Sequence, residues 1–214
     1  MKTLKADGLF IDLETGGLSP HRHGTTQIVA IAFAVDPTRM FGEGKLEEVD
    51  RLHIKVQPVD HMEYDRIALE MQGETAASLM QEGRTEGDAL GDLWRFADKH
   101  LDHQFGGRIW AHEASFDWSF IRAMAVRTFS PGYLPNFSLA QDRINWTCSK
   151  HLFRSLKQWG VVPHDQKENL RYIAEYYNLE FPERDHHRPL KDTEIALVAL
   201  DRIMADFAFY LKGQ

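Results

Sequence analysis

The 214-residue sequence has one cysteine, no long hydrophobic run and no excess of positive charge. Its single cysteine, Cys148, excludes an intramolecular disulfide and a metal knuckle built from several thiolates. No apolar run is long enough to cross a membrane, and no signal-peptide core precedes the first apolar segment. We therefore expect a protein of the reducing cytoplasm, without a membrane partner.

The formal net charge is −7, from 32 acidic and 25 basic residues. This balance argues against broad, sequence-independent capture of a nucleic acid duplex through its phosphates, but it allows a local site where metal ions carry the positive charge. Hydrophobic residues make up 43% of the chain, which is enough for a sizeable core. Because no internal repeat, low-complexity tract or long linker divides it, residues 1–214 are expected to form a single domain.

The first half of the chain predicts strands. Residues 9–13 (LFIDL) open it, and the unbroken apolar run of residues 27–35 (QIVAIAFAV) suits a central strand buried on both faces. Residues 51–57 (RLHIKVQ) alternate apolar and polar side chains, as an edge strand does. Residues 108–111 (RIWA) are short and apolar, which indicates a fourth strand.

Helical periodicity dominates the rest of the chain, beginning with residues 85–103. A helix that follows RIWA is expected to be capped by Ser115. Residues 168–178 predict an amphipathic helix that stops at Asn178 in the left-handed conformation. The last helix begins at about Pro189, where the missing N–H costs nothing. Strands first and helices interleaved later predict an α/β fold with a mixed sheet.

Three acids occupy positions where apolar side chains are expected. Asp12 and Glu14 are two residues apart in the first strand, so both point to the same face. Asp117 shares a helical face with Phe120 and Ile121, so its carboxylate points inward. Asp117 alone has an ordinary explanation, since an acid in the first turn of a helix interacts favourably with the helix dipole.

A fourth acid, Asp192, lies at the end of the first turn of the last helix. Ala196 and Ala199 are small enough to let this helix approach the sheet and bring Asp192 toward the first strand. His187 precedes the helix, and taken alone it is better explained as a solvated loop residue than as a functional one. The four acids together are harder to explain, because uncompensated buried carboxylates are costly and are relieved by protonation or by a metal. Oxygen ligands in this number suit Mg²⁺ or Mn²⁺.

Three segments carry a family resemblance: FIDLETGGL (10–18), WAHEASFDWSFI (110–121) and HRPLKD (187–192). In order and content they resemble the three motifs of the DEDDh (DnaQ-like) 3′→5′ exonucleases of the ribonuclease H-like superfamily. The third motif selects His187 rather than His186. Three departures from the pattern are present. Glu113 stands where many members have Asn, and Pro189 stands where Ala is usual. Residues 141–148 (QDRINWTC) have the Thr often found before the next helix but lack the Asp commonly beside it.

The resemblance implies a ribonuclease H-like fold, a five-stranded mixed β-sheet flanked by α-helices. It implies hydrolysis from the 3′ end of single-stranded DNA or RNA with two divalent ions, Mg²⁺ or Mn²⁺. The implied metal ligands are Asp12, Glu14, Asp117 and Asp192, with His187 as the general base. The implied substrate-binding residues are Thr15 and Gly16, through backbone N–H groups and close approach, and His112, Phe116 and Trp118. Taken alone, the two aromatic side chains are better explained as core residues than as a platform for stacking a base.

Two other functions compete with the exonuclease interpretation. The first is a catalytically silent nucleic-acid-binding adaptor of the same fold, which the complete set of acids disfavours. The second is an endonuclease, which the spacing between His187 and Asp192 disfavours. The sequence chooses neither DNA nor RNA, because 2′-hydroxyl recognition depends on one or two contacts. A homodimer is compatible with the family.

Overall fold

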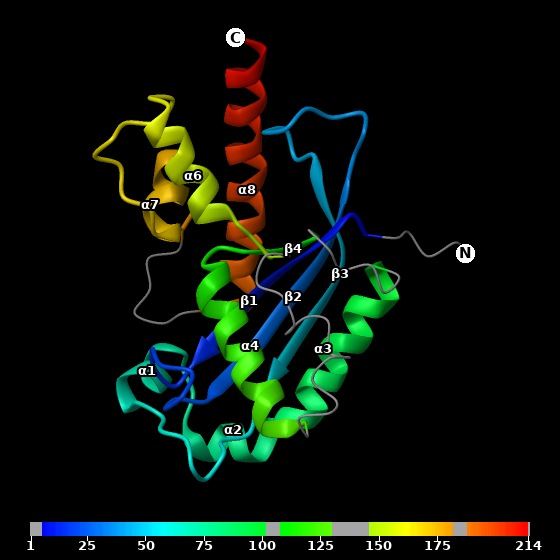
Figure 1. The fold of residues 1–214 in the computed structure, drawn as a ribbon, viewed down its shortest axis with the longest axis vertical. Helices are drawn as coiled ribbons and strands as arrows, with labels where there is room; N and C mark the ends of the chain where they lie inside the picture. The colour runs from blue at the N-terminus through cyan, green and yellow to red at the C-terminus, as the bar shows by residue number, and fades with distance from the viewer. Residues whose placement is uncertain (1–5, 102–107, 130–145, 182–187, 214) are drawn as a thin grey trace.

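The computed structural model describes residues 6–101, 108–129, 146–181 and 188–213 (Figure 1). Its strands are β1 (Gly8–Thr15), β2 (Thr25–Val35), β3 (Leu46–Lys55), β4 (Ile109–Ala111) and β5 (Trp146–Cys148). Its helices are α1 (Arg66–Met71), α2 (Ala76–Glu82), α3 (Glu86–Leu101), α4 (Ala114–Thr128), α6 (Ser149–Gln158), α7 (Leu170–Tyr176) and α8 (Pro189–Lys212). None of the helices in these ranges is both long enough and apolar enough to cross a membrane.

The five strands form one mixed sheet in the order β3-β2-β1-β4-β5. Strand β2 pairs antiparallel with β1 and β3, whereas β4 pairs parallel with β1 and β5. Strand β2 is buried from Thr25 to Phe33, as expected for a central strand. Strand β3 lies at the edge of the sheet and carries the predicted alternation. The fold class predicted from the sequence is confirmed.

Helices cover both faces of the sheet (Figure 1). Strand β1 shows how the side chains divide: Ile11 and Leu13 pack on the side of α3 and α4, while Phe10 packs on the side of α8. This division follows from the alternation of side chains along a strand. Helices α6 and α7 pack against α8 through a separate apolar cluster that contains Phe153 and Ile173. Asp12 and Glu14, at the alternate positions, therefore face the α8 side.

Several predicted boundaries are confirmed and some are wrong. Asn178 has a φ of 54°, so it ends α7 in the left-handed conformation as predicted. Helix α8 begins at Pro189, also as predicted. Strand β3 starts at Leu46, five residues before the predicted start. The prediction that Ser115 caps α4 is wrong: Glu113 is the N-cap, without a side-chain cap, and its carbonyl already accepts the N–H of Asp117 at 3.2 Å.

The sheet opens between β1 and β4, and this opening positions the functional site. The two strands are paired only at Leu9 and Phe10 of β1. Strand β1 continues to Thr15, whereas the chain leaves β4 after Ala111 and turns into α4. The carboxyl ends of two neighbouring parallel strands thus flank a crevice, and a crevice of this kind is a common place for ligands in open α/β sheets.

Candidate active site

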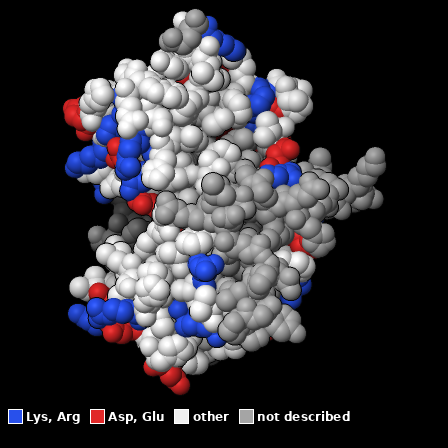
Figure 2. Space-filling view, viewed as in Figure 1, with Lys and Arg blue, Asp and Glu red and all other residues white. Residues whose placement is uncertain are grey.

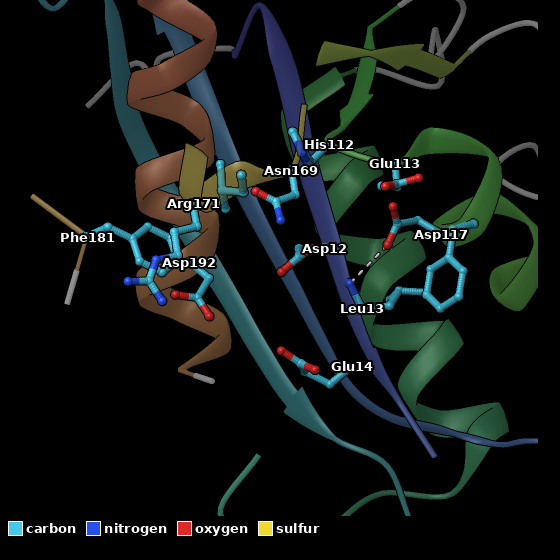
Figure 3. A pocket seen from close by; sticks show the side chains of 12 residues that line it. Asp12, Leu13, Glu14, His112, Glu113, Asp117, Asn169, Arg171, Phe181 and Asp192 are labelled. Carbon is cyan, nitrogen blue, oxygen red and sulfur yellow. Dashed lines mark hydrogen bonds between the residues drawn. The ribbon is translucent and has the colours of Figure 1, made fainter. Parts of the chain in front are cut away.

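A pocket of about 450 Å³ occupies the opening between β1 and β4 (Figure 3). Most of its lining comes from the end of β1 and from the N-terminal ends of α4, α7 and α8. Its lining comprises Asp12, Leu13, Glu14, His112, Glu113, Phe116, Asp117, Asn169, Leu170, Arg171, Phe181 and Asp192. The four carboxylates that the sequence singled out, which are far apart along the chain, therefore line one pocket.

Asp12 is positioned by the packing of α8 against β1. The hydroxyl of Thr193, in the second turn of α8, donates to the Pro189 carbonyl at 2.7 Å and lies 3.4 Å from Oδ2 of Asp12. Ala196 allows this approach, since it is buried in the cluster that joins β1, β2 and α8. Ala199, the other small residue singled out, instead packs in the cluster with α6 and α7. One of the two alanines thus has its predicted role.

Asp117 reaches the pocket from α4 on the opposite side of β1 (Figure 3). Its side chain is nearly inaccessible, and its Oδ1 accepts a hydrogen bond from the backbone N–H of Leu13 at 3.2 Å. Burial, and then the negative charge of Asp12, raise the pKa of the Asp117 carboxyl well above its usual range. A cation bound between these acids would relieve both effects, so this carboxyl fits a metal ligand.

Asp192 lies in the first turn of α8, where its Oδ2 accepts the backbone N–H of Arg188 at 3.2 Å. The four carboxylates surround the pocket without converging on one point. Within the ranges the structure describes, no three His, Cys, Asp or Glu side chains are grouped so that they could hold a metal ion. The oxygen donors and the buried acid therefore suit a hard divalent ion. The described side chains do not form a preformed cage around it.

Two of the predicted substrate-binding residues line the pocket. Burial lowers the pKa of His112 to about 4, so the ring is neutral at pH 7, and its Nδ1 lies 3.1 Å from Oγ of Ser149. Phe116 is half-buried and packs against Phe120, with ring centroids 4.8 Å apart. A neutral imidazole and an aromatic ring are both suited to contact with a nucleotide.

Three other predicted substrate-binding residues lie outside this lining. The Thr15 hydroxyl donates to the carbonyl of Gly17 at 2.7 Å. The N–H of Gly16 donates to the carbonyl of Gly24 at 2.8 Å, so in this structure it is used within the fold and is not presented to a ligand. Trp118 lines a different pocket, where the Arg122 guanidinium lies 5.6 Å from the ring centroid.

His187, the predicted base, lies outside the described residues. The pocket also contains residues that the sequence did not single out, including Asn169, Arg171 and Phe181. Asn169 is the N-cap of α7, a role that its position before an amphipathic segment could have revealed. Arg171 gave no such signal, because its place in the pocket depends on how α7 packs on α8.

Comparison with known proteins places the chain. A family model described as "Exonuclease" (RNase T type) matches residues 9–200. The chain belongs to this exonuclease family. Within it, the three motifs identify the chain as a DEDDh, DnaQ-like member of the ribonuclease H-like superfamily.

The curated relatives include ribonuclease T of Photorhabdus laumondii, which is 30% identical over 120 residues, and ribonuclease T of Buchnera aphidicola, which is 29% identical over 120 residues. Each match covers 55% of this chain and 53% of the relative. The chain thus spans about half the length of the curated relatives that it matches.

Solved structures support the fold. E. coli Exonuclease I in complex with a dT13 oligonucleotide superposes with a TM-score of 0.71 at 15% identity, over 97% of this chain and 43% of that one. The zinc-ion-bound form of the E. coli ExoI–ssDNA complex gives 0.67 at 15% identity, over 96% and 43%. At these identities the likeness establishes the shared ribonuclease H-like fold.

Proposed function

We propose that this protein is a metal-dependent 3′→5′ exonuclease that hydrolyses single-stranded DNA or RNA. One observation carries the proposal: four carboxylates from three elements line one pocket in a chain of the exonuclease family, and one of them is buried with a raised pKa. Burying an acid beside another acid is unfavourable without a cation. Stability therefore does not explain this arrangement, and a functional role does.

Asp12, Glu14, Asp117 and Asp192 would hold two divalent ions, Mg²⁺ or Mn²⁺. Bound there, the ions would neutralise the phosphate, lower the pKa of an attacking water and stabilise the leaving 3′ oxygen. The oxygen-only ligand set supports these ions. A zinc ion is bound in one ExoI–ssDNA complex, which supports divalent metal at this fold.

His187 would accept the proton of the attacking water, since a neutral imidazole is a suitable base near pH 7. It is bonded in the chain to Arg188, whose N–H donates to Asp192 in the pocket. Phe116 would stack on a base and His112 would hydrogen-bond to the terminal nucleotide. Both side chains border the carboxylates, which supports their roles.

The adaptor interpretation has less support, because a binding module gains nothing from a buried Asp117. The single-domain organisation of residues 1–214, the cytoplasmic location and a homodimer stay predictions. The choice between DNA and RNA is likewise left to experiment.

The direct test uses single-stranded DNA and RNA of one sequence, labelled at the 5′ end, with Mg²⁺ or Mn²⁺. We expect a ladder of progressively shorter labelled products that disappears with EDTA and with Asp12→Asn. Asp60→Asn is the matched control, because Asp60 is exposed and lies outside the pocket lining. A labelled mononucleotide as the first product would show that the enzyme degrades the strand from the 5′ end. Fixed internal fragments would indicate an endonuclease. Intact substrate with the correctly folded wild type would favour the adaptor.

A further inference from the structure

A second groove, of about 480 Å³, lies between α6 and the loop that leads to α7. Its charged lining has four positive side chains and two negative ones. The cations are Lys150, Arg154, Lys157 and Lys167, and the acids are Asp165 and Glu168. Figure 2 shows Lys and Arg side chains gathered at the upper left, over α6 and this loop. We call this surface the basic groove; its excess of positive charge contrasts with the net charge of −7 for the chain.

Ion pairs with Glu168 hold two of the cations of the basic groove in place. Glu168 accepts hydrogen bonds from Nη2 of Arg154 at 2.7 Å and from Nζ of Lys157 at 3.1 Å. These charges lower the pKa of the Glu168 carboxyl, so it stays ionised. Because one carboxylate is shared between two cations, the cluster keeps a positive excess. Both cations project from α6, which presents them on a rigid element.

The basic groove adjoins the catalytic pocket. Asn169 lines both hollows. Glu113, at the rim of the catalytic pocket, forms an ion pair with Lys150 of the groove. A polymeric substrate that extends out of the pocket between α4 and α7 therefore reaches the cations of α6 next.

The charges of the two hollows complement each other for a polyanion. The catalytic pocket is acidic and repels phosphate until metal ions are present. A single strand carries a phosphate at every nucleotide, so neighbouring cations can supply affinity that the pocket cannot. We propose that the basic groove binds the phosphodiester backbone of the substrate strand on the 5′ side of the nucleotide being removed. This inference rests on the proposed function.

The test compares the metal-loaded wild type with the Arg154→Gln/Lys167→Gln variant on a dinucleotide and on a 15-nucleotide strand. Both side chains are exposed, and Glu168 keeps Lys157 as a partner in the variant. We expect the ratio of kcat/KM for the long strand over the dinucleotide to fall roughly tenfold, because only the long strand reaches the groove. The dependence of log KM for the long strand on log salt should weaken by about 1.4, since the variant removes two cations and each phosphate that is no longer neutralised lowers this slope by about 0.7.

The matched control is Arg95→Gln/Lys99→Gln, which also removes one arginine and one lysine charge, but from exposed, acid-paired positions on α3. It should leave the ratio unchanged. The charge-conserving variant Arg154→Lys/Lys167→Arg should restore most of the long-strand preference. An unchanged ratio in Arg154→Gln/Lys167→Gln, or an equal fall in the control, would overturn the inference.

A binding measurement separates this inference from the proposed function. In the Asp12→Asn background, fluorescence anisotropy with a labelled 15-nucleotide strand reports affinity without cleavage. Weaker binding after Arg154→Gln/Lys167→Gln supports the groove, and unchanged binding refutes it. Failure of the wild type to cleave either substrate would instead count against the exonuclease proposal.

Discussion

Asp117 shows at the level of one residue how this molecule combines stability with chemistry. The fold buries its carboxyl, ties it to the Leu13 N–H and places it near Asp12. Without a cation the folded protein keeps a proton on Asp117 to a higher pH than the unfolded chain does. The folded state therefore loses stability as the pH rises from about 4 toward the raised pKa.

Asp117→Asn should remove this loss, because the amide oxygen can still accept the Leu13 N–H and carries no charge. We expect the metal-free variant to be more stable than the wild type at pH 7 by on the order of 1–2 kcal/mol. Added Mn²⁺ should stabilise the wild type more than the variant. Urea denaturation between pH 4 and 8, with EDTA and with Mn²⁺, measures both effects.

The comparison isolates Asp117 because other titrating groups are common to both proteins. His112, with a pKa of about 4, adds the opposite slope: stability increases between about pH 4 and its ordinary pKa near 6.5. If the free energy of unfolding depends on pH in the same way in wild type and variant, ionisation of Asp117 does not destabilise the folded protein.

Some site residues were predictable one by one. Alternation in a strand gave the shared face of Asp12 and Glu14, and helical periodicity gave the inward direction of Asp117. Arg171 was not predictable, since its periodicity on α7 marks only an exposed position. Gly16 was assigned a contact that its hydrogen bond to Gly24 already uses. Local sequence patterns thus predict the direction in which a side chain points. The groups that it contacts depend on how distant segments pack.

At the scale of elements, the approach of α8 to β1 builds the acidic pocket. Ala196 is 3% exposed and lies in the cluster with Phe10, Val29 and Ile31. A larger side chain there cannot fit unless the helix or the sheet moves. Such a movement would change the separation of Asp192 from Asp12.

Ala196→Leu should therefore lower the free energy of unfolding by about 1–3 kcal/mol and weaken both Mn²⁺ binding and hydrolysis. Val198→Leu is the matched control, since Val198 is 47% exposed on the same helix. Thermal unfolding and Mn²⁺ titration of both variants measure the effect. Loss of stability in Ala196→Leu with full activity would mean that the site tolerates displacement of α8.

Long elements were easier to predict than short ones. The periodicity of α3, α4 and α8 extends over many turns, and β2 is a continuous apolar run. Strands β4 and β5 have three residues each, too few to show an alternation, and β5 was expected only through the family resemblance. Helices α1 and α2, with six and seven residues, were missed for the same reason.

At the scale of the whole molecule, charge is separated in space. The acids gather at the opening between β1 and β4, while the basic groove lies beside it on α6. The overall charge of −7 hides this arrangement, because composition does not say which charges the fold brings together. The sequence could predict the fold class and the four acids, but the opening that joins them follows from strand order and from the shortness of β4.

The central claim is that metal ions held by the four carboxylates act on the phosphodiester at the 3′ end of a strand. The most direct measurement replaces a non-bridging oxygen of that phosphodiester with sulfur, as separate diastereomers, and compares hydrolysis in Mg²⁺ and Mn²⁺. Sulfur binds Mg²⁺ poorly and the softer Mn²⁺ better. The account predicts strong slowing in Mg²⁺ and recovery in Mn²⁺ for at least one diastereomer. Equal slowing in both metals for both diastereomers would contradict it.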